Sequence, residues 1–345
     1  MDKTFVYCGS WGFTRELKGI HVFSFDTVNK MLTPIGVFGE HLSQSIIAIR
    51  GDLLFCVSER RDSGFVFSYR IAPDGSLSQL DRLKSSGLTL SYVTLDPVGP
   101  YAFVSSMVNA TLDVIRYDEN GRMEITDTVR HMGHSVTPRQ NKSILHGVFT
   151  EPDGDFIAAM NLGADEIVTH RLDRISGRLE FIGCIPIDPG RGPRHMVFHP
   201  SRKYAYVLAG MGSRVYAYKV KDGLLREIAA YNTQSFDEKQ EGQAADIITS
   251  GDGRFLYATN RGQSNIACWK ISGETGALEP LGHFPCGGVG PRGISMGPDD
   301  HVIFAANTDS DMLSVIAVDR KTGCPGDVLQ TLDVPGACCI RLYPR

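Results

Sequence analysis

Short segments of alternating apolar and polar residues recur along the whole chain, and no stretch carries the spacing of an amphipathic helix. Such alternation, interrupted by Gly, Pro and Asp, is typical of antiparallel strands. One copy of the recurring phrase is Val148-Phe149-Thr150-Glu151-Pro152-Asp153-Gly154-Asp155-Phe156, in which an apolar strand, a turn and an aromatic strand follow one another. Further copies lie at 197–204 and 248–255, with weaker ones at 95–101 and 295–300. The pattern predicts an all-β protein built from repeats.

The spacing of the repeat identifies its architecture. Successive blocks lie 45 to 55 residues apart and begin near Ser45, Ser91, His146, His195, Ala245, Gly293 and Cys338. About fifty residues for four strands is the period of a propeller blade. The last block holds one strand, 338–342, and the N-terminal segment supplies three, 5–8, 19–25 and 32–38. Joining them predicts a single domain over 1–345, a seven-bladed β-propeller without open sheet edges at its ends.

Composition excludes several classes of protein. The chain has 345 residues with 35 basic and 39 acidic side chains, a formal charge of −4 that argues against a nucleic-acid-binding surface. It has no long apolar span and no secretory signal at its start, so we expect a cytoplasmic protein without a membrane partner. The eight cysteines are scattered, as expected of buried free thiols. No metal or cofactor is expected, and a closed propeller has no obligatory partner surface, so we expect a monomer.

Two positions in each blade are expected to face the mouth of a propeller channel: the start of the innermost strand and the loop after the second strand. The ends of the second strands align on a place that is Ser or Asn in six of seven blades: Ser10, Ser58, Ser106, Asn161, Asn260 and Asn307, with Ala209 in the remaining blade. Short polar residues there are expected to cap loops. The next place varies and includes the charged Glu59 and Arg261. The innermost strands add His146, Arg194, His195, Asp246 and Arg292.

The cationic candidates His146, Arg194, Arg261 and Arg292 favour an anionic ligand, because a guanidinium donates two parallel hydrogen bonds to carboxylate or phosphate. Structural roles stay open for the same residues. The Gly-Pro-Arg turns at 192–194 and 290–292 can bond the carbonyls of neighbouring blades, and Glu59 can pair with Arg60 or Arg61 in solvent. Three other histidines are expected to be structural or exposed: His199 within its own turn, and His131 and His134 on an exposed insertion around 133–143.

The run Gly192-Pro193-Arg194-His195-Met196-Val197-Phe198-His199-Pro200 resembles the signature of the bacterial 6-phosphogluconolactonase propellers. The resemblance extends over essentially the whole chain, including 245–247, 252–262 and 291–292. The same family contains the fungal 3-carboxymuconate-lactonizing enzymes, which form a lactone and whose site is built from a His, two Arg and a Glu. The resemblance implies that His146, Arg194 and Arg261 match the first three groups. The place of the Glu falls on Ala209-Gly210, so that group is absent here.

The leading hypothesis is therefore a hydrolase that opens a sugar-acid lactone. We expect His146 to activate water, since imidazole is tuned for that role near neutral pH. Arg194 and Arg261 are expected to bind the anionic substituent or the developing oxyanion, with Glu59, His195, Asp246 and Arg292 as further substrate contacts. Two alternatives stay open: a lactonizing cycloisomerase, which the missing Glu disfavours, and a non-catalytic propeller that binds a small anion or a partner protein.

Overall fold

The computed structural model describes residues 4–12, 18–221, 224–234 and 243–344. Within these ranges, twenty-eight strands form seven four-stranded sheets, with three short 3-10 helices at Pro138–Gln140, Pro298–Asp300 and Thr308–Ser310. The predicted all-β, seven-bladed β-propeller is confirmed. In the described part of the chain no helix is long and apolar enough to cross a membrane.

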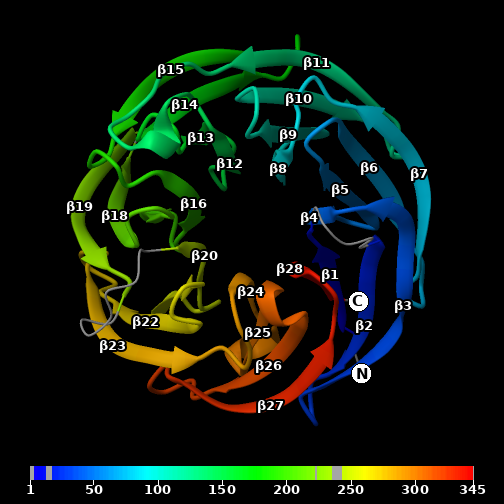
Figure 1. Cartoon of the computed structure of the whole chain (residues 1–345), viewed down its shortest axis with the longest axis vertical. Helices are drawn as coiled ribbons and strands as arrows, with labels where there is room; N and C mark the ends of the chain where they lie inside the picture. The colour runs from blue at the N-terminus through cyan, green and yellow to red at the C-terminus, as the bar shows by residue number, and fades with distance from the viewer. Residues whose placement is uncertain (1–3, 13–17, 222–223, 235–242, 345) are drawn as a thin grey trace. The chain divides into compact units, whose positions relative to one another are not determined.

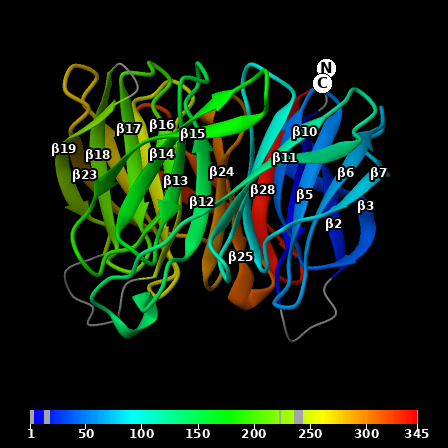
Figure 2. The same cartoon turned by 90° about the horizontal axis from the view of Figure 1, so that it is seen from above.

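The blades divide between two compact units, the first built from Gly9–Val22 and Ile35–Arg194. It contains three complete blades. Their strands are β4 (Gln44–Arg50), β5 (Leu53–Glu59), β6 (Gly64–Ile71) and β7 (Leu77–Lys84); β8 (Leu90–Leu95), β9 (Tyr101–Ser106), β10 (Thr111–Tyr117) and β11 (Met123–Arg130); and β12 (Leu145–Thr150), β13 (Ile157–Asn161), β14 (Glu166–Asp173) and β15 (Arg178–Pro186). Figure 2 shows β12 and β13 running side by side in one of these blades.

The second unit comprises Met1–Cys8, Phe23–Pro34 and His195–Arg345. Its strands include β16 (Pro193–Phe198), β17 (Tyr204–Ala209), β18 (Arg214–Lys221) and β19 (Leu224–Asn232); β20 (Ala244–Thr249), β21 (Phe255–Asn260), β22 (Asn265–Ile271) and β23 (Leu278–Pro285); and β24 (Pro291–Met296), β25 (Val302–Asn307), β26 (Met312–Val318) and β27 (Pro325–Asp333). The division falls within β16, directly before His195. A single domain over residues 1–345 therefore stays a prediction.

The seventh blade joins the two ends of the chain. Its order is β28 (Ala337–Pro344), β1 (Thr4–Ser10), β2 (Lys18–Asp26) and β3 (Met31–Leu42). The red C-terminal strand β28 lies beside the dark blue β1 in Figure 1. The predicted closure by N-terminal strands is therefore confirmed.

The second strand of each blade forms the core, and its alternation serves two neighbours at once. Every residue of β21 is buried. Leu256 belongs to a cluster with Tyr206 of β17, whereas Tyr257 belongs to a cluster with Ile303 of β25. Successive side chains of a strand point to opposite faces of its sheet. Because each sheet packs between two neighbouring blades, its second strand must be apolar on both faces. This requirement explains the apolar runs seen in the sequence.

The prediction that the cysteines are buried free thiols holds for most of them but not for all. All eight are free, and six are buried as predicted, but Cys184 is exposed and Cys324 is half-buried. The prediction was wrong for Cys184 because it lies in β15, an outermost strand in which most side chains are at least partly exposed.

Phenol groups of the second strands hold the outer hairpin of the following blade. The Tyr206 hydroxyl donates to the Gly276 carbonyl at 3.0 Å, and the Tyr257 hydroxyl donates to the Gly323 carbonyl at 2.8 Å. Both glycines have φ near +75°, and a Cβ added to Gly276 would lie 2.4 Å from the Tyr204 ring. Glycine is required here by both the backbone conformation and the close ring.

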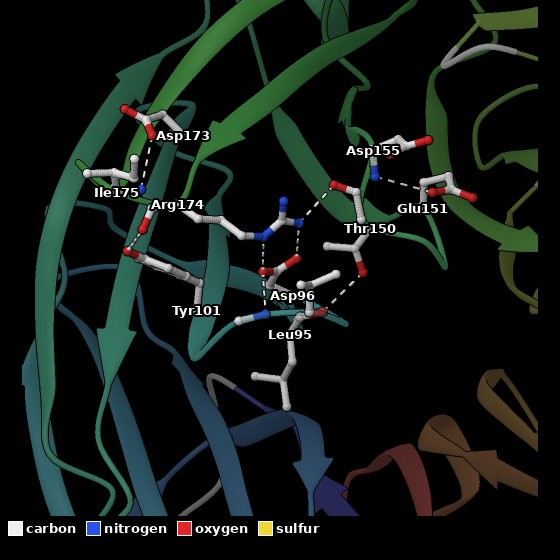
Figure 3. Close-up of polar contacts among 12 residues, drawn as sticks. Leu95, Asp96, Tyr101, Thr150, Glu151, Asp155, Asp173, Arg174 and Ile175 are labelled. Carbon is white, nitrogen blue, oxygen red and sulfur yellow. Dashed lines mark hydrogen bonds and ion pairs between the residues drawn. The ribbon is translucent and has the colours of Figure 1, made fainter.

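A buried ion pair joins the β8–β11 and β12–β15 blades. Figure 3 shows Arg174, in the turn after β14, donating to both carboxylate oxygens of Asp96, each at 2.8 Å. The Tyr101 hydroxyl donates to the Arg174 carbonyl at 2.9 Å, and Thr150 donates to the Leu95 carbonyl at 3.1 Å. The Asp96 side chain is only 2% exposed and that of Arg174 is 34% exposed, so the pair is shielded mainly on the acidic side.

We expect Gly276→Ala to destabilise the protein by about 1–3 kcal/mol more than Gly51→Ala. Gly51 is the matched control because its φ is also positive, +56°, but nothing lies within 4 Å of an added Cβ. Urea unfolding of both variants measures the difference. Equal losses would show that the Tyr204 ring does not restrict this turn.

Replacing Arg174 with Met leaves a buried carboxylate without its cation and is expected to cost about 2–3 kcal/mol. Arg70→Met is the control, since its partner Asp52 is 53% exposed and the pair is expected to contribute less than about 1 kcal/mol. Adding Asp96→Asn to Arg174→Met should recover part of the loss. Thermal unfolding of the four proteins tests this, and a similar cost for both Arg variants would contradict it.

Candidate functional site

Two of the candidate cations, His146 and Arg292, stand on β-bulges at the start of innermost strands. In β12, Leu145 pairs with Asn161 and Gly147 pairs with the adjacent Met160, so His146 is an extra residue. In β24, Arg292 is the extra residue in the same way. A bulge bends the strand and redirects the side chain of the inserted residue. Equivalent one-residue shifts at the start of β4, β8 and β20 make this a property of the repeat.

His146 and Arg194 form a direct pair within the first unit. The Nη1 atom of Arg194 lies 2.6 Å from Nε2 of His146, and the residues are only 5% and 4% exposed. A guanidinium has donors and no acceptor, so Arg194 donates and the His146 Nε2 accepts. This assigns the hydrogen of His146 to Nδ1 and makes its imidazole neutral. The sequence predicted both residues near one mouth of the channel, and their direct contact is a feature that the structure adds.

Groups of neighbouring strands fix the backbone of the pair. The hydroxyl of Ser105 donates to the His146 carbonyl at 3.2 Å, and that of Ser91 donates to the Leu145 carbonyl at 3.1 Å. On the other side, a Cβ on Gly147 would lie 2.5 Å from the Arg194 carbonyl oxygen. Gly147 and Arg194 thus approach so closely that a side chain at position 147 would displace the backbone of Arg194.

The constant polar place at the end of the second strand has the structural role that was predicted. The Asn161 Oδ1 accepts from Ser143 Oγ at 2.8 Å and from Ile144 N at 3.3 Å, directly before His146. In another blade, Asn260 bonds both the hydroxyl and the carbonyl of Thr233, at 2.7 and 2.6 Å. These side chains satisfy backbone groups of the neighbouring loops.

A second polar pair, His195 with Asp246, lies in the second unit. His195 Nδ1 lies 2.8 Å from Asp246 Oδ1, and Asp246 Oδ2 accepts from Ile294 N at 3.1 Å. Burial acts to raise the pKa of Asp246, but the hydrogen bond and charge of His195, the charge of Arg341 and the Ile294 N–H outweigh it, so the pKa is lowered. The carboxylate is ionised at neutral pH and therefore orients the His195 ring with its hydrogen on Nδ1.

The remaining predicted residues differ in burial. Glu59, the last residue of β5, is 1% exposed. Glu59 is therefore too buried to form an ion pair in solvent. The Arg60 guanidinium, one of its two possible partners, bonds Asp62 at 3.1 Å. Arg292 is buried, and Arg261 is half-buried in the turn after β21, where its N–H donates to the Gln243 carbonyl at 3.1 Å. Contact of these residues with a substrate stays a prediction.

The expectation of an exposed His131 was wrong. His134 is exposed, but His131 is 6% exposed and its Nε2 lies 3.1 Å from Nε2 of His170 in β14. The chain leaves β11 against the neighbouring blade, and this buries the imidazole. Burial, with the charge of His170 as a smaller cause, lowers the pKa of His131 to about 4, and burial lowers that of His170 to about 4.

Two features of the sequence need the structure for their interpretation. The run Gly293-Ile294-Ser295-Met296-Gly297 has the G-x-S-x-G pattern of a nucleophile elbow, yet Ser295 lies inside strand β24 and not at a strand-to-helix turn.

Asp165, which follows β13, is not among the residues predicted from the sequence, although it contacts the loop that leads to Arg194. The repeat could have pointed to it, because Ser213, Ser264 and Asp311 occupy the same place. Among the described residues no three His, Cys, Asp or Glu side chains gather as metal ligands would.

The acid stability of the protein should depend on the His131–His170 pair. Both imidazoles have a folded pKa near 4 against 6.5 for an unperturbed one, so the unfolded chain binds more protons below pH 6.5. Stability is complete above pH 6.5 and falls toward pH 4, by up to about 1.4 kcal/mol per pH unit for each histidine. We expect His170→Gln to flatten this loss and the exposed-site variant His134→Gln to leave it unchanged. Unfolding free energies measured from pH 7.5 to 4 test this, and parallel curves for all three proteins would contradict it.

Comparison with known proteins gives a consistent result. The family model described as "Lactonase, 7-bladed beta-propeller" matches residues 5–342. A 6-phosphogluconolactonase of Formosa agariphila is 27% identical, over 98% of this chain and 99% of its own length, and one of Bacillus subtilis is 27% identical over 94% of each chain. The solved periplasmic gluconolactonase of Pseudomonas aeruginosa is 25% identical with a TM-score of 0.93, over 99% of both chains.

Proposed function

This chain belongs to the lactonase family of seven-bladed β-propellers, and we propose that it is a hydrolase that opens a sugar-acid lactone. Relatives that span its whole length carry the names 6-phosphogluconolactonase and gluconolactonase. The observation that carries the proposal is the buried pair of His146 and Arg194, in which a neutral imidazole and a permanent cation are in direct contact.

The reaction needs a base for water and a positive group for the oxygen that becomes charged. Water adds to the ring carbonyl, whose π electrons move onto its oxygen, and the carbon–oxygen bond of the ring then breaks. The proton removed from the water finally rests on the former ring oxygen, and a hydroxy acid is the product. His146 takes up the proton and returns it, while Arg194 stabilises the oxyanion or binds the anionic substituent.

The hydrogen bond between Arg194 and His146 requires that substrate binds before His146 takes up a proton. Nε2 of His146 accepts from Arg194, so this lone pair becomes available to water when the guanidinium turns to an anionic group of the substrate. A carboxylate or phosphate is a stronger partner for the guanidinium than an imidazole is. Substrate binding therefore releases the base. Arg261 is a second candidate for anion binding, and Glu59, His195, Asp246 and Arg292 are further candidate contacts that follow from the sequence.

Acid release at constant pH from 6-phosphogluconolactone and gluconolactone, corrected for spontaneous opening, tests the proposal. We expect wild type to exceed the blank most clearly on 6-phosphogluconolactone, whose phosphate is the anionic group that draws Arg194 from His146. His146→Ala is expected to lose about 10²–10⁴-fold in kcat, because the base is removed. Arg194→Ala is expected to lose about 10²-fold or more in kcat/KM. His134→Gln, at an exposed site, should keep full activity.

A loss below threefold in His146→Ala would remove His146 from the mechanism. Rates equal to the blank on every lactone would contradict the proposed function itself. The absorbance of a carboxymuconate then tests whether the chain is a cycloisomerase.

A further inference from the structure

The carboxylate of Asp165 is the acceptor for two different segments near Arg194. Asp165 lies between β13 and β14, is 4% exposed, and has φ of +56°. Its Oδ1 and Oδ2 accept from the N–H groups of Gly192 and Gly190, each at 2.6 Å. It also accepts from Gln140 Nε2 at 2.7 Å and from the Ser135 hydroxyl. Four donors satisfy a carboxylate that would otherwise be costly to bury.

The segment 190–192, which Asp165 bonds through two glycines, leads directly to Arg194, so Asp165 restrains the position of Arg194. Only Pro193 separates Gly192 from Arg194, and the ring of proline fixes its φ. A displacement of Gly192 therefore moves the start of β16, and with it the guanidinium that contacts His146. The second segment, through Ser135 and Gln140, belongs to the insertion that precedes His146.

Other blades also place an acceptor for a glycine N–H at this position. Ser264 Oγ accepts from Gly290 N at 3.2 Å, and Asp311 Oδ1 accepts from Gly336 N at 2.8 Å. Bonding a glycine N–H from this place is thus a property of the repeat. Asp165 combines this bond with contacts to Gln140 and Ser135, so one carboxylate joins the loop leading to Arg194 to the insertion that precedes His146.

We propose that Asp165 is the positioning residue for the Arg194–His146 pair. The inference rests on the proposed function for its effect on turnover, but its effect on the pair is independent of the reaction. Asp165 acts through the backbone of Gly190 and Gly192 and is not itself in contact with His146 in this arrangement. Its loss is expected to leave the blade folded and to loosen the hydrogen bond between Arg194 and His146.

The experiment compares Asp165→Asn with Asp311→Asn, which makes the same change at the equivalent place of another blade. Asp165→Ser is the second variant, since serine already serves at this place in Ser264. The first readout is kcat/KM on the lactones together with its division into kcat and KM. The second is the ¹⁵N resonance of the His146 ring Nε2 in the substrate-free protein, assigned with His146→Gln.

We expect both Asp165 variants to lower kcat/KM by about 10- to 100-fold, as misplacement of a catalytic group by about 1 Å does. They should shift the His146 Nε2 resonance, because its donor moves away, whereas Asp311→Asn should alter kcat/KM less than twofold and leave the resonance in place. An unshifted resonance in the Asp165 variants would overturn the inference whatever the activity. A shifted resonance without any wild-type turnover would retain the positioning role and reject the proposed function.

Discussion

One backbone hydrogen bond recurs in several blades at the point where the chain passes to the next blade, including the loop that leads to Arg194. The first residue after an outer strand donates to a carbonyl in the turn between the second and third strands of its own blade. His131 donates to Ala110 at 2.9 Å, and Ile187 donates to Asp165 at 2.9 Å. The acceptor residues have positive φ, +50° and +56° in these cases, a conformation that L-residues adopt at a cost. The bond restrains the turn and the connecting loop together, so the next innermost strand begins at a fixed place.

The β-bulge completes this arrangement. In a regular strand the side chain of the first residue would point to one face of the sheet, toward the apolar side chains of an adjoining blade. One additional residue redirects the side chain and releases it from this packing. His146 and Arg292 occupy such bulges, and Ser91 occupies one in the blade before His146. The polar candidates therefore stand where the repeat tolerates polar groups without disturbing the apolar second strands.

Most of the fold could be predicted from the sequence, because it depends on local patterns. The apolar second strands, the turns and the period of about fifty residues give the number of blades. The types of residue at the site followed from the same alignment, which pointed to His146 and Arg194. Their pairing did not follow, because it depends on a register shift of a single residue between strands. The burial of His131 was missed for a similar reason, since its partner His170 is 39 residues away in another blade.

The insertion before His146 is best explained by the same geometry. It lies in the longest interval between blocks, the 55 residues from Ser91 to His146, and it is polar. Ordering such a segment costs about 1–2 kcal/mol of conformational entropy per residue, and a polar loop recovers little of this by burying apolar surface. Hydrogen bonds must hold it, and Gln140 supplies two of them, to the Leu162 carbonyl at 2.8 Å and to Asp165 at 2.7 Å. Asp165 also binds the segment leading to Arg194. The hydrogen bonds that order the insertion therefore also restrain the position of the guanidinium, which is a physical role for the additional residues.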